Sequence, residues 1–228
     1  MRTTLIIFIS VLLLIPQITK AQFIVSGGMT NGLAISSVSY PAYEDIPNKV
    51  FTGLYGEIGY EGISGDITLK LGTSIPRNYS VTYDDVDWDG TITNVTQETR
   101  VGMNTLGLSG RYLIVGGNGS DFIFHIVSGI EMAWFPVTEE YITADGSEEV
   151  KQIINAIRGA GGLGFQIEVQ NFYVVTDLLY KYPFLSFTDI FTVGAEVPDS
   201  PFFCANIGIK FYLDEIFGNK TEDNYIRE

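Results

Sequence analysis

The chain has 228 residues, of which 46% are hydrophobic and 13% aromatic, and its formal net charge at pH 7 is −14. This acidic balance argues against nucleic-acid binding, which needs a basic surface. The single cysteine, Cys204, excludes an exported domain held together by disulfides and is best explained as a small packed residue.

The first 21 residues have the pattern of a cleaved secretory signal peptide. Arg2 supplies the positive start, residues 5–16 are mostly apolar, and the small residues Thr19 and Ala21 precede the expected cleavage point. The apolar stretch is shorter than the ~20 residues that a membrane-spanning helix needs. A retained anchor is the alternative. No cysteine follows Ala21 closely, which excludes a lipoprotein anchor.

Beyond the signal peptide, apolar and polar residues alternate with a period of two, which is typical of strands. In the clearest case, Phe203, Ile207 and Phe211 alternate with polar residues that include Asn206 and Lys210. The alternation predicts eight strands, at residues 23–30, 50–60, 63–71, 101–115, 122–134, 163–169, 172–183 and 203–213.

The connections between these segments alternate in length. Short turns are expected at residues 61–62, 116–120 and 170–171. Long polar loops are expected at residues 31–49, 76–99, 137–152 and 184–200. This alternation predicts an all-β fold, an eight-stranded antiparallel up-and-down transmembrane β-barrel with short periplasmic turns and long extracellular loops. The barrel domain would cover residues 22–213, followed by a polar periplasmic tail over residues 214–228.

One segment, residues 147–158, fits two structures. Four of its apolar residues share one face of a helix: Val150, Ile153, Ile154 and Ile157. The same segment also extends a strand upward, pairing with residues 137–143 across a turn at residues 145–146. We favour a strand from about Ile153 onward.

Alternation alone does not say which face meets solvent, because a soluble lipocalin-like barrel has the same number of strands with its apolar face inward. The apolar faces here are long and rich in Leu, Ile and Phe. Aromatic residues gather near the strand ends, which matches the two girdles of a membrane barrel. The expected girdles are Tyr60, Tyr112, Phe122, Phe172 and Phe211 at the periplasmic rim, and Phe51, Trp134, Tyr180, Tyr182 and Phe203 at the outer rim.

The opposite face carries isolated charges of both signs among Gly, Ser and Thr. Charges inside a narrow lumen must be paired, because an unpaired one costs several kcal/mol. We expect one network near the periplasmic edge, formed by Glu57, Arg111, Glu168 and Lys210, with Asp66, Lys70, Glu131 and Asp177 above it. Lys181 and His125 also point inward. Since eight strands leave room only for side chains, this network should close the lumen.

Three segments resemble a known family. They are Thr19-Lys20-Ala21-Gln22, the glycine-rich Gly159-Ala160-Gly161-Gly162-Leu163-Gly164-Phe165, and Asn206-Ile207-Gly208-Ile209-Lys210-Phe211-Tyr212-Leu213. Together with the strand layout, they resemble the outer-membrane β-barrels of Bacteroidota, which include OmpA-like, OmpX-like and PorT-like proteins. The resemblance implies a location in the bacterial outer membrane. By analogy with PorT-like proteins, it also suggests a role in an envelope or secretion complex.

The sharpest local motif lies in the second long loop. Asp85, Asp87 and Asp89 alternate and are followed by Gly90, like the first half of a calcium-binding loop. Thr96 stands where such a loop needs its bidentate Glu, and the nearest acid is Glu98. The alternative is a solvated acidic loop without a cofactor.

Catalysis is not expected. His125 is the only histidine and points into the lumen near the periplasmic end, and Glu131 and Asp177 have no evident cleft between them. The leading hypothesis is a non-enzymatic protein with a plugged lumen and a structural or interaction role. Its partners would be outer-membrane lipid and proteins that meet the long loops or the barrel wall. The alternatives are a soluble lipocalin-like barrel for an apolar ligand and, more weakly, a lipid-modifying enzyme.

Overall fold

The computed structural model describes residues 22–34, 50–86, 88–116, 120–188 and 201–213. The expected signal peptide and tail, residues 1–21 and 214–228, lie outside the described residues, so cleavage after Ala21 stays a prediction.

The described residues form ten strands. They are β1 (Gln22–Ala34), β2 (Val50–Gly62), β3 (Gly65–Ser74), β4 (Arg77–Val86), β5 (Ile92–Val101), β6 (Asn104–Val115), β7 (Phe122–Thr143), β8 (Gly146–Val169), β9 (Phe172–Thr188) and β10 (Phe202–Tyr212).

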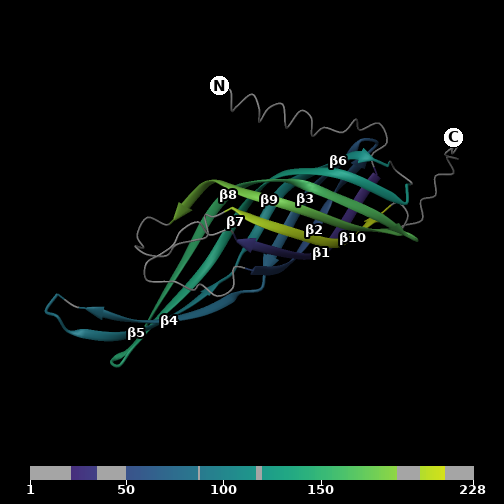
Figure 1. The fold of residues 1–228 in the computed structure, drawn as a ribbon. Helices are drawn as coiled ribbons and strands as arrows, with labels where there is room; N and C mark the ends of the chain where they lie inside the picture. The colour runs from purple at the N-terminus through teal and green to yellow at the C-terminus, as the bar shows by residue number, and fades with distance from the viewer. Residues whose placement is uncertain (1–21, 35–49, 87, 117–119, 189–200, 214–228) are drawn as a thin grey trace, which may run out of the picture.

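Eight of these strands close into a ring (Figure 1). The ring order is β1, β2, β3, β6, β7, β8, β9 and β10, with β10 pairing back onto β1, and every pair is antiparallel. Each ring strand overlaps one of the eight predicted segments, so the predicted eight-stranded antiparallel barrel is confirmed. The closed ring leaves no free edge, which is the condition that a hydrocarbon environment sets for strands.

The turn between β2 and β3 lies two residues further along than predicted. Glu61 pairs with Asp66 and Gly62 with Gly65, so residues 63–64 make the turn. The expected turn at residues 61–62 is therefore wrong. The shift matters because it places Glu61 on a strand with its side chain inside the barrel.

A hairpin, β4–β5, occupies most of the segment that was expected to be an irregular loop. Its second strand continues the path of β6 along the edge of β7, with Val101 opposite Val137 and Asn104 opposite Trp134. Gly102 bridges the two strands and donates a backbone hydrogen bond to the Pro136 carbonyl at 3.0 Å.

Residues 147–158 are part of a strand, and the helical alternative is wrong. The strand β8 begins at Gly146, earlier than the favoured start near Ile153, and pairs with β7 across the expected turn at Asp145–Gly146. Gly146 has φ 149°, a conformation that favours glycine. Neighbouring apolar residues take opposite faces: Ile153 is half exposed and Ile154 is buried. This alternation has the period of a strand.

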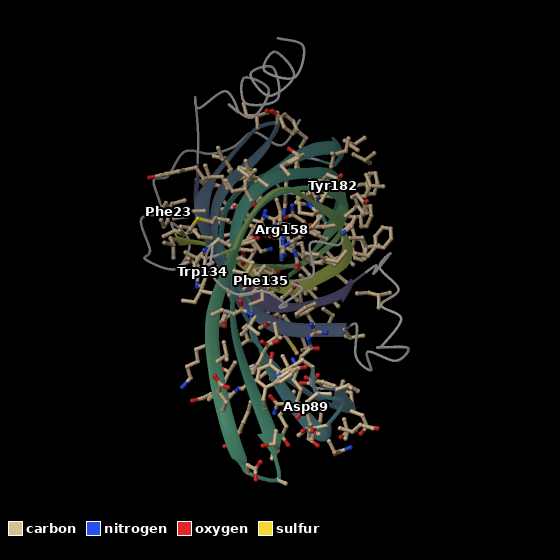
Figure 2. The ribbon with its side chains drawn as sticks, turned by 90° about the vertical axis from the view of Figure 1, so that its left-hand side faces the viewer. Phe23, Asp89, Trp134, Phe135, Arg158 and Tyr182 are labelled. Carbon is tan, nitrogen blue, oxygen red and sulfur yellow. The ribbon has the colours of Figure 1, made fainter. Side chains whose placement is uncertain are left out.

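Beyond the ring, four strands continue as a sheet in the order β4, β5, β7 and β8. We call this sheet, residues 77–101 and 137–153, the outer sheet. It projects from the end of the barrel that is opposite the short turns (Figures 1 and 2). Much of two segments expected to be loops is thus regular structure.

The outside of the ring is apolar because alternate residues of each strand point outward. Leu69 is 43% exposed and Ile207 is 53% exposed. Similar outward side chains surround the ring: Met29, Leu54, Ile58, Leu71, Leu108, Ile126, Ile130, Met132, Leu163, Ile167, Leu178 and Ile209. No helix among the described residues is long and apolar enough to cross a membrane.

Aromatic pairs lie near both ends of this apolar belt. At the short-turn end the ring centroids of Phe23 and Tyr60 are 5.2 Å apart. At the opposite end those of Tyr180 and Phe203 are 5.3 Å apart. Phe51, expected in the outer girdle, is instead buried inside the barrel, because it shares the inward face of β2 with Tyr55 and Glu57.

We expect Leu69→Arg and Ile207→Arg each to lower the free energy of unfolding by ~2–4 kcal/mol, because each places a charge at mid-height on the apolar belt. The measurement is urea unfolding in lipid vesicles, followed by heat-modifiable gel migration. Ile142→Arg is the matched control, because Ile142 lies on the outer sheet beyond the belt. Unchanged stability of both belt variants would show that the assignment of faces is reversed.

Candidate functional site

The inside of the ring carries a buried, charged core. Five acids and five bases of the ring strands point inward: Glu57, Glu61, Asp66, Glu131 and Asp177, with Lys70, Arg111, Arg158, Lys181 and Lys210. The formal charges of these described residues cancel. Such a balance is required where burial makes an unpaired charge costly.

Arg111 on β6 is the centre of the larger charge cluster. Its Nη2 donates to Glu57 Oε2 at 2.8 Å and to Asp177 Oδ2 at 2.9 Å, and its Nη1 lies 3.4 Å from Asp66 Oδ2. His125 Nε2 lies 2.7 Å from Asp177 Oδ1. The cluster therefore joins β2, β3, β6, β7 and β9 across the lumen.

A second group of contacts lies at the short-turn end. Lys210 Nζ donates to Glu61 Oε2 at 2.5 Å, and the Tyr212 hydroxyl donates to the same oxygen at 2.9 Å. Lys210 Nζ also lies 3.9 Å from Asp66 Oδ2, which connects this group to Arg111. A small apolar cluster of Ile24, Ile123, Tyr173, Val175 and Tyr212 packs at the same end.

A third group lies toward the outer sheet. Lys181 Nζ donates to Glu131 Oε2 at 2.6 Å, and Arg158 Nη1 lies 3.8 Å from Glu131 Oε1. The Arg158 guanidinium also lies over two rings, 4.6 Å from the centroid of Phe135 and 4.7 Å from that of Phe202. The buried cation is thus held between a carboxylate and aromatic faces.

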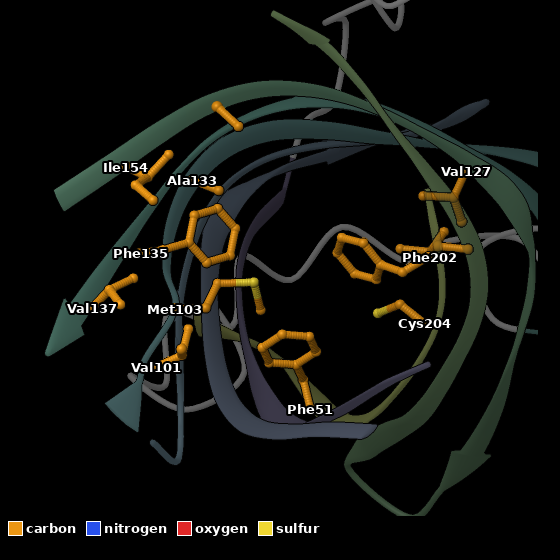
Figure 3. Close-up of a cluster of buried hydrophobic side chains, with 12 residues drawn as sticks. Phe51, Val101, Met103, Val127, Ala133, Phe135, Val137, Ile154, Phe202 and Cys204 are labelled. Atoms are coloured by element: carbon orange, nitrogen blue, oxygen red, sulfur yellow. The ribbon is translucent and has the colours of Figure 1, made fainter. Parts of the chain in front are cut away.

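A cluster of apolar side chains, called the apolar plug below, lies inside the ring toward the outer-sheet end (Figure 3). It consists of Phe51, Val101, Met103, Val127, Ala133, Phe135, Val137, Ile154, Ala156, Leu179, Phe202 and Cys204. This cluster was not predicted from the sequence. The available signal was that Phe51, Phe135 and Phe202 each fall on the inward set of their strand.

Two cavities of about 20 Å³ lie beside Lys70, one toward Glu131 and one toward Phe51. A volume of this size holds about one water molecule. Among the described residues, neither cavity has room for an apolar ligand.

The structure brings several of the predicted lumen residues together and leaves one of them apart. It brings Glu57, Arg111, Asp66 and Asp177 together, with Lys70 Nζ 3.0 Å from Glu57 Oε1. Glu168 stands apart: it accepts a hydrogen bond from the Tyr173 hydroxyl at 3.2 Å and forms no ion pair among the described residues.

Two charged residues of the lumen were not predicted from the sequence. Glu61 was assigned to a turn, and Arg158 lay in the segment with two possible structures. Both are fully buried in the lumen. A correct register for β2 and β8 would have placed both on inward faces.

The proposed calcium loop lies at the tip of the β4–β5 hairpin. Asp87, one of the three predicted calcium ligands, lies outside the described residues. The Asp89 carboxylate accepts a backbone hydrogen bond from Thr91 at 2.9 Å, which lowers the pKa of Asp89. Among the described residues, no group of three acidic, histidine or cysteine side chains is arranged to hold a metal ion. Calcium binding by Asp85, Asp87 and Asp89 stays a prediction.

The outer sheet carries an unusual row of like charges. Glu98 on β5 lies opposite Glu140 on β7, which lies opposite Glu149 on β8. Like charges directly opposite each other destabilise a sheet. At the tip of the β4–β5 hairpin, Trp88 is 98% exposed.

Comparison with known proteins gives structural neighbours only. No family model and no curated protein sequence matches the chain. Ail, the attachment invasion locus protein of Yersinia pestis, is 10% identical with a TM-score of 0.46, and the match covers 85% of this chain and 100% of that one. A major outer membrane protein of Thermus thermophilus is 16% identical with a TM-score of 0.48 and coverages of 84% and 98%.

A third neighbour is Neisserial surface protein A, which is 12% identical with a TM-score of 0.45 and coverages of 84% and 98%. At these identities each likeness concerns the fold alone. The ring closure itself rests on the strand pairing of this chain.

We expect Arg111→Met to lower the free energy of unfolding by about 3–5 kcal/mol, because it leaves Glu57, Asp66 and Asp177 buried without their shared cation. Urea unfolding in vesicles measures the loss. Adding Glu57→Gln and Asp177→Asn to the same chain should restore part of the stability. Lys151→Met is the control, since its ion pair with Glu149 is exposed. An Arg111 variant as stable as the control would contradict the role of the cluster.

Proposed function

We propose that the protein is a non-enzymatic anchor in the bacterial outer membrane that holds the outer sheet on the cell surface for contacts with other proteins. The single observation that carries this proposal is the distribution of side chains on the closed ring, apolar outside and charged inside. A lipid environment stabilises this arrangement, because hydrocarbon contacts the apolar belt while the charges stay inside the barrel. In water the apolar belt would be exposed.

The filled lumen supports an anchor rather than an open pore. From the short-turn end, the Lys210 group, the Arg111 cluster, the Glu131 group and the apolar plug follow one another along the barrel. An eight-stranded barrel has only enough interior for such side chains. Passage of a solute would require several of these layers to separate at once.

Two other functions have less support. A lipocalin-like carrier needs an apolar chamber, whereas the two cavities beside Lys70 in the described lumen are water-sized. An enzyme needs an accessible site. His125 and Asp177 form a close pair, but both are buried between the ring strands. The contact of Asp177 with Arg111 is explained by charge pairing.

The outer sheet is the part best placed to meet a partner. It is regular and continuous with the barrel wall through β7 and β8, and it carries acids on its exposed face. A rigid support of this kind lowers the ordering cost of binding compared with a flexible loop. This supports a role as a docking platform or as a subunit of an envelope complex.

Cysteine labelling on intact cells tests the location and direction of the barrel. In a Cys204→Ser background, Asp145→Cys at the outer-sheet tip should react with a membrane-impermeant maleimide. Asn171→Cys, in the short turn between β8 and β9, should react only after lysis. The reverse pattern would show that the sheet faces the periplasm, and a protein recovered without detergent would refute the anchor.

We expect no steady current steps from the purified protein in planar bilayers, with an open porin as the positive control. Phe135→Ala combined with Phe202→Ala should remain closed as well, because the ion-paired layers lie below the plug. Regular steps from the unmodified chain would contradict the closed lumen.

A further inference from the structure

A row of directly opposed lumen positions crosses five neighbouring strands. On β2, β3, β6, β7 and β8, its members are, in order, Glu57, Lys70, Gly107, Glu131 and Arg158. The row therefore reads acid, base, glycine, acid and base. Opposed side chains on one face of a sheet are neighbours, so the glycine leaves a gap between Lys70 and Glu131.

The backbone packing requires glycine at this gap. A Cβ on Gly107 would lie 2.7 Å from the Ile130 carbonyl oxygen and 2.8 Å from Glu131 Cβ. One of the two cavities of about 20 Å³ lies here, lined by Gly107 and Gly129 among others. The space between the charged neighbours is thus a fixed feature of the barrel wall.

Charged groups of both signs surround this cavity. Glu57, Lys70, Glu131 and Lys181 all line it, and their side chains are between 1% and 11% exposed. Lys70 Nζ lies 3.0 Å from Glu57 Oε1, and Lys181 Nζ donates to Glu131 Oε2 at 2.6 Å. An ammonium group has three N–H donors, so each lysine has donors beyond the one that this contact uses.

Two carboxylate oxygens beside the cavity need a donor. Among the described residues, Glu57 Oε1 and Glu131 Oε1 are buried and accept no hydrogen bond. Each does lie near a cation, with Glu131 Oε1 3.8 Å from Arg158 Nη1. A buried acceptor without a hydrogen bond costs free energy. The cavity therefore borders two acceptors that lack donors and two cations that have donors to share.

These groups select the occupant of the cavity. A metal cation would be repelled by Lys70 and Lys181, and a halide would be repelled by the carboxylates of Glu57, Glu131 and Asp177. The volume suits one water molecule and nothing larger. Water offers two donors and two acceptors, which is the complement of two carboxylate oxygens and two ammonium groups.

From this geometry we propose that the cavity beside Gly107 binds one water molecule, which donates to Glu57 Oε1 and Glu131 Oε1 and accepts from Lys70 and Lys181. Lys70 belongs to the Arg111 cluster through Glu57, and Lys181 belongs to the Glu131 group. The water links these two groups into one hydrogen-bonded network and stabilises the folded barrel. This inference goes beyond the proposed function and does not depend on it.

A crystal structure of the full chain in detergent, at a resolution that shows ordered waters, tests the site. Separate crystals are soaked in rubidium bromide for anomalous scattering from both ions. We expect one water within hydrogen-bond distance of Glu57 Oε1 and Glu131 Oε1, and no anomalous peak at that position. A rubidium or bromide peak there would overturn the proposal. Direct hydrogen bonds from the lysines to both oxygens, with no atom between, would overturn it as well.

Ala160→Val tests the contribution of the water to stability. Ala160 lines the cavity and lies opposite Gly129 and Lys181. Two added methyl groups exclude the water and leave the carboxylate oxygens without a donor. The unfolding equilibrium constant in lipid vesicles should therefore rise about tenfold. Ala156→Val is the matched control, because it adds the same methyl groups to the apolar plug from the same strand.

The control measures the effect of crowding alone, so its unfolding constant should rise less. Equal increases in the two valine variants would overturn the stabilising link. Ala160→Ser gives a second reading, because its hydroxyl is smaller than the valine side chain and donates a hydrogen bond in place of the water. This variant should lose less stability than Ala160→Val. A serine variant that is as unstable as the valine variant would contradict the proposal.

Discussion

The structure depends on one constraint: ten charged side chains must be neutralised inside a ring of eight strands. Arg111 contributes most to this neutralisation, because its guanidinium contacts three carboxylates. They are Glu57, Asp66 and Asp177, which belong to three different strands. Such a bidentate and planar cation suits several carboxylates at once. Charge pairing across the lumen, together with the backbone ladder around it, holds opposite walls at a fixed separation.

Side-chain size is adjusted to this arrangement. A Cβ on Gly164 would collide with Asp177 Oδ1 and His125 Nε2, so glycine on β8 leaves the space in which these two groups meet. Glycine within a strand often marks a tight bend at a barrel corner. At Gly164 the reason is more specific, since the missing side chain makes room for a charged contact in the lumen.

Strands were predictable where alternation was long and uniform, as from Phe203 to Phe211. Errors arose where local pattern and long-range pairing differed. Val150, Ile153, Ile154 and Ile157 fit a helix by spacing, and only the pairing with β7 decides for a strand. Glu61 and Arg158 were missed because their lumen positions depend on the exact register of β2 and β8. The β4–β5 hairpin was missed because its polar, threonine-rich strands resemble a loop in composition.

The length of β7 has a mechanical consequence. Its 22 residues are paired with β8 from Phe122 to Thr143, so one ladder runs from the short-turn end to the outer tip. At ~3.3 Å per residue such a strand spans about 70 Å. A pull on the tip along the strands moves β7 and β8 together, so it would load many hydrogen bonds of the β6–β7 and β8–β9 ladders in shear at the same time. The β4–β5 hairpin, attached through its own short ladder, would instead peel away one bond after another.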